Sequence, residues 1–154
     1  MSRAKRVFFL LIIILVVIQF FRPALNKSKQ AYPNDISRVY PLPDKVQGVL
    51  RTSCYDCHSN STTYPWYAHI QPVGWWLAAH IKEGKEELNF NEFGNYSRRR
   101  QQSTLKAIAS SIKDRAMPLD SYTLIHEKAK LSANDKELVL QWIEQTKDIL
   151  SKKK

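Results

Sequence analysis

Residues 54–58 read CYDCH, and this stretch contains both cysteines of the 154-residue chain. Two thiols at this spacing with an imidazole directly after them suit three kinds of chemistry: a redox-active disulfide, a zinc site and covalent attachment of a haem. Two cysteines allow one disulfide at most, so a fold stapled by disulfides is excluded. The three remaining possibilities require different local structures and partner residues, which the rest of the sequence has to supply.

The length and composition are those of one domain of ordinary size. Of the formal net charge of +10, six basic side chains and no acidic one lie in the first 30 residues. Two other basic runs, residues 98–100 and 152–154, are not accompanied by spaced aromatic residues. We therefore interpret both runs as solvated surface and expect no nucleic-acid partner.

Residues 1–25 are predicted to form an N-terminal signal anchor that is not cleaved. The basic flank SRAKR precedes a run from Val7 to Phe21 that is apolar except for Gln19, which as a helix would measure about 22 Å and could span a bilayer if extended to Leu25. No A-x-A-like cleavage pattern follows the run. Residues 26–43 are polar and contain prolines, so we expect a tether leading to a domain over residues 44–154.

The predicted domain is all-α, with no alternating pattern typical of a strand. Four segments place apolar residues at helical spacing, namely 46–53, 77–88, 105–116 and 138–150. The first leads directly into Cys54. We expect the third helix to start at the N-cap Ser103 and to be stopped by Pro118. The fourth is expected to start at Ser132, with Asp135 completing a capping box.

A zinc site and a redox dithiol both fit the surrounding sequence poorly. Zinc needs four protein ligands, or three and a water, and the available histidines, His69 and His80, lie outside zinc-finger spacing. A thioredoxin-like pair is expected at the start of a helix that follows a strand, whereas Cys54 follows a predicted helix. Neither chemistry explains why His58 stands directly after Cys57.

Attachment of one haem c per chain uses all three residue types of the motif. Cys54 and Cys57 would form two thioether bonds to the macrocycle, and His58 would be the proximal ligand of the iron. The second ring nitrogen of His58 should donate a hydrogen bond to a carbonyl that orients the ring, for which Pro72 is our candidate. Covalent attachment requires the cytochrome c maturation machinery, which would place the C-terminal domain in the periplasm and the apolar run in the inner membrane.

A second axial ligand is predicted in the segment DRAMPLDSYTL, before the last helix. Met117 is the only methionine after the first residue, and a Met/His axial pair raises the reduction potential of a haem. A core methionine that fills a gap is the alternative reading. His80, beside the apolar stripe of its helix, is the second candidate for this position.

The blocks CYDCHSNSTTYPWYAHIQPVGWWLAAHIKEGKEELNFNEF (54–93) and MPLDSYTLIHEKAKLS (117–132) resemble the bacterial haem-binding domain family of c-type cytochrome-like proteins. The resemblance runs from about Val46 to Ile149. It implies a small cytochrome c-like helical domain, usually exported and tethered to a membrane, with the same roles for the motif residues and Met117. It also implies that Trp66, Trp75 and Trp76 pack around the haem.

Our first hypothesis is therefore a membrane-anchored electron carrier, not an enzyme, whose redox partner the sequence does not name. The second is a haem-based sensor or weak peroxidase, in which the sixth coordination position is open or easily vacated. A cysteine-pair oxidoreductase without haem is the third.

Overall fold

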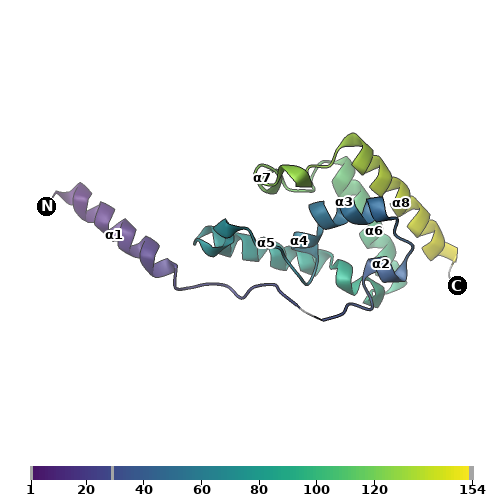
Figure 1. The fold of residues 1–154 in the computed structure, drawn as a ribbon, viewed down its shortest axis with the longest axis horizontal. Helices are drawn as coiled ribbons and strands as arrows, with labels where there is room; N and C mark the ends of the chain where they lie inside the picture. Colours follow the sequence, from purple (N-terminus) through teal and green to yellow (C-terminus); the bar gives the residue numbers. More distant parts are fainter. Residues whose placement is uncertain (1, 29, 153–154) are drawn as a thin grey trace.

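The computed structural model describes residues 2–28 and 30–152, and its regular elements are all helices (Figure 1). The prediction of an all-α fold is thus confirmed for this part of the chain. Four residues lie outside the described part of the chain: Met1, Lys29, Lys153 and Lys154. The predicted anchor and the predicted tether therefore each lack one described position, and the basic run 152–154 lacks two. In chain order the elements are α1 (Arg3–Ile18), α2 (Ile36–Val39), α3 (Asp44–Ser53), α4 (Tyr55–His58), η1 (Trp66–His69), α5 (Val73–Glu87), η2 (Phe90–Asn95), α6 (Arg98–Lys113), α7 (Asp120–Thr123), η3 (Glu127–Ala129) and α8 (Ala133–Lys152).

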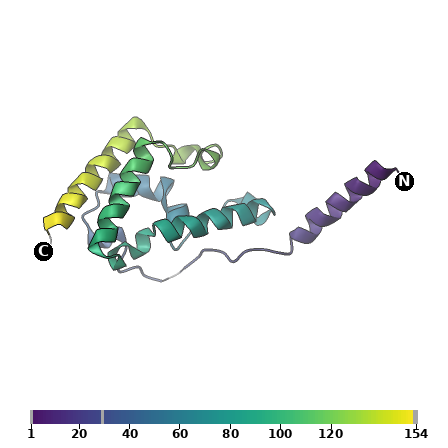
Figure 2. The same cartoon turned by 180° about the vertical axis from the view of Figure 1, so that it is seen from behind.

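The main core lies where α8 packs against α3 and α6 (Figures 1 and 2). Val139 and Ile143 on the inner face of α8 are fully buried in one cluster with Leu50 of α3 and Leu105 of α6. Each of these side chains stabilises the fold by about 1.5–3 kcal/mol through burial. The predicted apolar faces of these three helices are therefore the faces that the structure buries.

The start of α8 is the predicted capping box. The hydroxyl of Ser132 accepts a hydrogen bond from the backbone N–H of Asp135 (3.1 Å), and the Asp135 carboxylate accepts one from the backbone N–H of Ser132 (3.0 Å). These reciprocal bonds satisfy two donors that a helix start leaves without a partner. The prediction for this helix start is confirmed.

The predicted start of the third helix was wrong by six positions. The N-cap of α6 is Ser97, whose hydroxyl accepts from the N–H of Arg100 (3.3 Å), while Ser103 lies inside the helix and donates to the Arg100 carbonyl. The basic run at 98–100 is therefore the first turn of α6. The helix ends at Lys113, well before Pro118, and the chain then reverses through Arg115 with φ 58°.

A second, smaller apolar cluster joins α5 to η1. Ala68, Leu77 and Ile81 are its buried members, which matches the predicted stripe on α5. Gly74 permits this contact, because a Cβ at that position would lie 2.4 Å from the carbonyl oxygen of Ala68. The helix α5 then extends back toward the main core, where it packs on α4.

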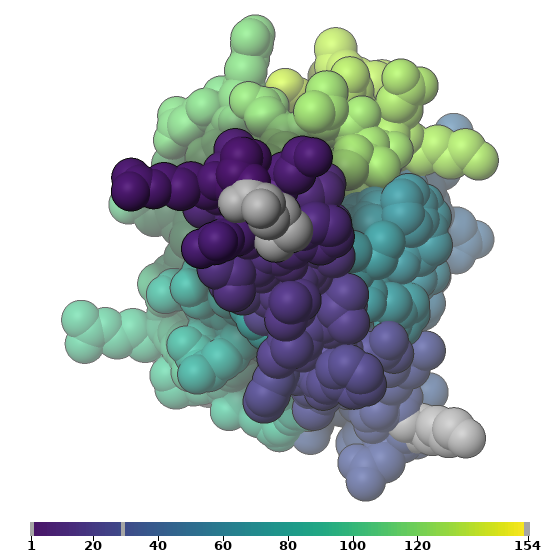
Figure 3. Space-filling model, turned by 90° about the vertical axis from the view of Figure 1, so that its left-hand side faces the viewer, coloured from purple at the N-terminus to yellow at the C-terminus, as the bar shows by residue number. Residues whose placement is uncertain are grey.

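The helix α1 stands apart from the rest of the molecule (Figures 1 and 2). Figure 3, viewed from the α1 side, shows it projecting toward the reader in front of the domain. Over the described ranges, no helix has the length and apolarity needed to cross a bilayer, so the predicted transmembrane helix is not supported. The physical reason is that α1 ends at Ile18 after 16 residues, or about 24 Å, instead of continuing toward Leu25.

The predicted tether, residues 26–43, contributes to the domain itself. Ile36 is fully buried in the main core, and Asp35 is buried beside it. The Asp35 carboxylate accepts hydrogen bonds from Asn91 (2.7 Å) and from the hydroxyl of Tyr55 (3.3 Å). The packed unit therefore begins before residue 44.

Candidate functional site

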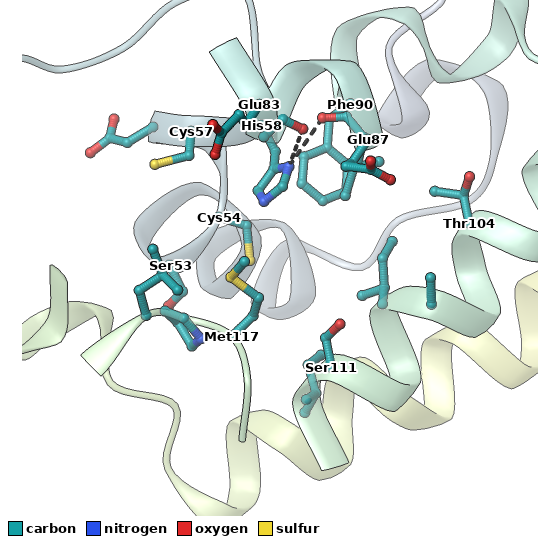
Figure 4. Close-up of a pocket in the computed structure, with 18 of the residues that line it drawn as sticks. Ser53, Cys54, Cys57, His58, Glu83, Glu87, Phe90, Thr104, Ser111 and Met117 are labelled. Carbon is teal, nitrogen blue, oxygen red and sulfur yellow. Dashed lines mark hydrogen bonds between the residues drawn. The ribbon is translucent and has the colours of Figure 1, made fainter. Parts of the chain in front are cut away.

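A cavity of about 740 Å³ lies between α4, α5, α6 and the loop that follows α6 (Figure 4). Its volume falls in the range of about 300–1,000 Å³ that is typical of pockets for bound small molecules. The two cysteines, His58, Met117 and His80 all line it, so the structure brings five predicted site residues together. The other lining residues are Ser53, Asp56, Glu83, Gly84, Glu87, Leu88, Phe90, Arg100, Ser103, Thr104, Ala107, Ile108, Ser111, Ile112, Pro118, Leu119, Tyr122 and Leu131.

Two backbone carbonyls hold the ring of His58. Its Nδ1 lies 2.7 Å from the carbonyl oxygen of Gly84 and 3.1 Å from that of Leu88. Carbonyl oxygens only accept, so Nδ1 carries the proton and Nε2, which faces the cavity in Figure 4, carries the lone pair. Burial lowers the pKa of His58 below its ordinary value, which favours the neutral ring that binds a metal. A carbonyl acceptor was predicted correctly, but Pro72 was the wrong residue: it stands at the other end of α5.

Close packing around His58 depends on Gly84 and Phe90. A Cβ at position 84 would lie 3.0 Å from the carbonyl oxygen of Cys57 and 3.4 Å from Cε1 of His58. The fully buried ring of Phe90 meets the imidazole edge-on, with centroids 6.4 Å apart. Phe90 was missed by the sequence analysis because η2 has no apolar periodicity that would identify it.

The two thiols are free and partly buried, and both cysteines line the cavity, Cys57 from α4 and Cys54 from the junction before it (Figure 4). Burial, and then the nearby Cys57, raises the pKa of Cys54 to about 12. Burial, and then Asp56, raises the pKa of Cys57 to about 11. A catalytic dithiol needs a lowered thiol pKa. The environment of this pair therefore disfavours the cysteine-pair oxidoreductase.

Met117 enters the same cavity from the loop between α6 and α7 (Figure 4). Its side chain is 39% exposed. The loop is tied to the end of α6, because the Ser111 carbonyl accepts from the N–H groups of Ala116 (2.9 Å) and Met117 (3.3 Å). The thioether and the Nε2 of His58 therefore face one space from two different walls.

A set of hydrogen bonds connects these two walls. The hydroxyl of Tyr122, in α7, donates to the carboxylate of Asp56 at 2.8 Å, and Asp56 lies between the two cysteines. The ring of Tyr122 stacks on His126 with centroids 4.3 Å apart. His126 in turn has its Nε2 2.6 Å from the hydroxyl of Tyr67. No pattern in the sequence predicts this set, because its members lie in short segments without apolar periodicity.

His80 lines the cavity, but its ring is also engaged with its own helix. Nδ1 of His80 lies 2.9 Å from the carbonyl oxygen of Trp76 and must donate to it. The rings of these two residues are in contact, with centroids 4.2 Å apart.

The three tryptophans expected to pack around a haem do not line the cavity. Trp66 is 76% exposed on η1. Trp75 donates from its indole nitrogen to the carbonyl of Phe21 at 2.6 Å. Trp76 lies one turn before His80, beyond the end of the cavity. This placement has a physical reason: α5 turns His80, Glu83, Gly84 and Glu87 toward the cavity, and its first turn projects past it.

The donor set fits a haem better than a bare metal ion. No group of three or more histidine, cysteine, aspartate or glutamate side chains is placed to hold a metal ion in the described part of the chain. Two thiols, an imidazole with an available lone pair and a thioether line one cavity instead. Apolar side chains complete its walls, among them Phe90, Ile108 and Leu119.

Comparison with known families agrees with this fit, because the model of the haem-binding domain matches residues 13–145. The chain belongs to the haem-binding domain family. The match spans most of the chain and contains all the cavity residues named above. No curated protein and no solved structure matches the sequence. Membership of the family supports haem binding, and the finer chemistry has to be argued from the residues of the site.

Proposed function

We propose that this haem-binding domain is a monohaem c-type cytochrome-like electron carrier. In this proposal Cys54 and Cys57 attach the haem covalently, and His58 and Met117 are the two axial ligands of its iron. The observation that supports it most strongly is the convergence of these four side chains on one cavity (Figure 4). His80 is the alternative sixth ligand.

Each residue has a defined task in this proposal. Cys54 and Cys57 would hold the haem, since each thiol would add across a vinyl double bond, with sulfur bonded to one carbon and the thiol proton transferred to the other, so that no oxidant would be consumed. The carbonyls of Gly84 and Leu88 keep the proton of His58 on Nδ1 and direct Nε2 into the cavity. When bound, the haem supplies a one-electron iron couple, whose potential a Met/His pair raises. No substrate-binding or proton-transferring residue is required, so the proposed role is not enzymatic.

The proposed location is outside the cytoplasm, in the periplasm at the inner membrane. The maturation machinery that forms the two thioether bonds is the partner this chemistry requires, and it works there. The basic flank and the apolar run of α1 support export. The exposed apolar side chains of α1 also support attachment to the membrane. Fractionation of cells expressing the full chain tests this part of the proposal.

Haem staining of denaturing gels tests covalent attachment. The full chain made with the maturation machinery should retain the stain, and Cys54→Ala/Cys57→Ala should lose it. The absence of stain in the unmutated protein would refute covalent attachment. Loss of the sulfur-to-iron charge-transfer band in Met117→Ala, with the band retained in His80→Ala, would assign the sixth ligand.

A haem-based sensor or weak peroxidase is the second candidate, and one observation favours it. Met117 is 39% exposed on a loop rather than held inside a helix, so its displacement would open the sixth position to a small ligand. Rapid binding of carbon monoxide to the unmutated ferrous protein would support the sensor. Slow binding that becomes fast in Met117→Ala would support the electron carrier.

A further inference from the structure

We propose that Arg100, at the start of α6, binds a propionate carboxylate of the haem and so fixes the edge of the ring opposite the two thioether bonds. This inference rests on the proposed haem site and takes the orientation of the ring from Cys54 and Cys57, but it does not depend on ligation by Met117. It assigns a function to one member of the basic run at 98–100, which the sequence analysis interpreted as solvated surface.

The guanidinium group of Arg100 is held in place before any ligand binds. It lies over the ring of Tyr96, with Cζ 4.0 Å from the centroid. Its Nη2 donates to the carbonyl oxygen of Glu86 at 3.1 Å. A guanidinium has five N–H donors, so this bond leaves others for a carboxylate. A group ordered in this way loses little conformational entropy on binding.

The position of Arg100 matches the geometry of a haem held by the cysteines. The vinyl-derived carbons and the propionates occupy opposite edges of the macrocycle. In Figure 4, Cys57 lies on one side of His58 and Thr104 on the other. Arg100 stands one turn before Thr104 on α6 and also lines the cavity. The hydroxyl-bearing Ser103 lies beside them, which makes this end of the cavity polar.

The charge of the cavity favours a cation at this end. Among its described lining residues, Arg100 is the only arginine or lysine. The other lining groups that can change charge are Asp56, Glu83, Glu87, His58, His80, Tyr122 and the two cysteines. Because Glu87, next to the Glu86 carbonyl that Arg100 contacts, is a carboxylic acid that lines the cavity, further carboxylates at this end would be repelled without a compensating charge. A guanidinium is suited to a carboxylate because it forms two parallel hydrogen bonds.

Affinity for ferric haem and for its dimethyl ester provides the test. The full chain, made without the maturation machinery, would be titrated with each compound, and so would Arg100→Gln, Arg100→Lys and Arg99→Gln. Arg99→Gln is the matched control, since it removes the same charge from the adjacent position, which does not line the cavity. We expect Arg100→Gln to weaken haem binding about fivefold and to leave ester binding unchanged. Arg100→Lys should retain part of the preference for haem over its dimethyl ester, because it keeps the positive charge.

The haem-loaded protein offers a second, independent readout. Loss of a cation near the ring stabilises the ferric state, so Arg100→Gln should lower the midpoint potential more than Arg99→Gln does. Equal effects of Arg100→Gln on haem and on the ester, or a potential equal to that of Arg99→Gln, would overturn the assignment. Failure of covalent attachment would appear in the haem stain alone and would leave the comparison with the ester intact.

Discussion

The two walls of the haem cavity are built in different ways. On the α4 and α5 wall, the ring of His58 is fixed by two carbonyls and by close contacts with Gly84 and Phe90. On the other wall, Met117 lies on a loop with a partly exposed side chain. If His58 and Met117 are the axial ligands, as proposed, the looser wall would allow the bond to Met117 to be adjusted or broken while the bond to His58 persists. This difference separates an electron carrier from a sensor.

The largest effect should be the slow alkylation of Cys57, which lies on the rigid α4 and α5 wall. With a pKa of about 11 for Cys57, against an ordinary 9.0, the thiolate fraction at about pH 8 is roughly 100-fold lower than in the unfolded chain. In Cys54→Ser protein made without haem, we therefore expect iodoacetamide to alkylate Cys57 about 100-fold more slowly than in urea. The rate, followed by mass spectrometry, should rise about tenfold per pH unit up to about pH 11.

The same raised pKa affects stability in one direction. The folded state keeps the thiol protonated, so its stabilising contribution is complete below pH 9.0 and is lost as the pH rises through about 11. Urea unfolding at increasing pH should show this loss. Alkylation of the folded protein at the unfolded rate near pH 8 would mean that the thiol is not protected by this wall.

The second prediction concerns the close contact at Gly84. An added methyl group would press on the carbonyl of Cys57 at 3.0 Å, so Gly84→Ala should reduce the free energy of unfolding by about 1–3 kcal/mol. Gly48→Ala is the matched control, because nothing lies within 4 Å of a Cβ built there. Helix propensity should make that control more stable by about 0.5–1 kcal/mol. Urea unfolding of the haem-loaded proteins, followed by circular dichroism, measures both, and an equal gain in the two variants would contradict the tight packing.

The third prediction tests how the looser wall is held. Removal of the Tyr122 hydroxyl breaks its hydrogen bond to Asp56, which links the Met117 loop to the attachment motif. Tyr122→Phe should destabilise the closed position of the Met117 loop by about 1–2 kcal/mol, the contribution of one hydrogen bond to a charged group. Met117 would then leave the iron more often, so carbon monoxide should bind several-fold faster, with the haem stain unchanged. Tyr64→Phe is the control, since its hydroxyl accepts from the N–H of Asn26 and does not line the cavity. Equal rates in the two variants would show that Tyr122 does not position Met117.

The sequence was informative where local patterns repeat. The apolar spacing of α3, α5 and α8 and the capping box at Ser132 could all be predicted, and so could the cavity positions of the motif and Met117. The start of α6 could not, because RRRQQ has no apolar periodicity. Neither could the burial of Asp35, whose partner Asn91 is 56 residues away.

Some residues of the cavity could not be predicted either, because no local sequence pattern marks them. Gly84 and Leu88 act through backbone carbonyls, which any residue possesses. Phe90 and Tyr122 lie in irregular segments, so their places in the cavity wall depend on tertiary packing alone. The tryptophans were assigned to the haem by resemblance alone, and their positions along α5 and η1 place them outside the cavity lining.

The smallest expected effect is that of replacing Trp66, which lies outside the cavity. Trp66 is 76% exposed and does not line either wall of the cavity, so Trp66→Ala should change the free energy of unfolding by no more than about 0.5 kcal/mol. It should also leave the haem spectrum and the binding of carbon monoxide unchanged. Phe90→Leu, which replaces the fully buried ring against His58, should alter the spectrum, because the imidazole loses its edge-on support. If Trp66→Ala alters the spectrum as much as Phe90→Leu does, then the haem reaches beyond the two walls to η1, and the resemblance, rather than the cavity, identified its contacts correctly.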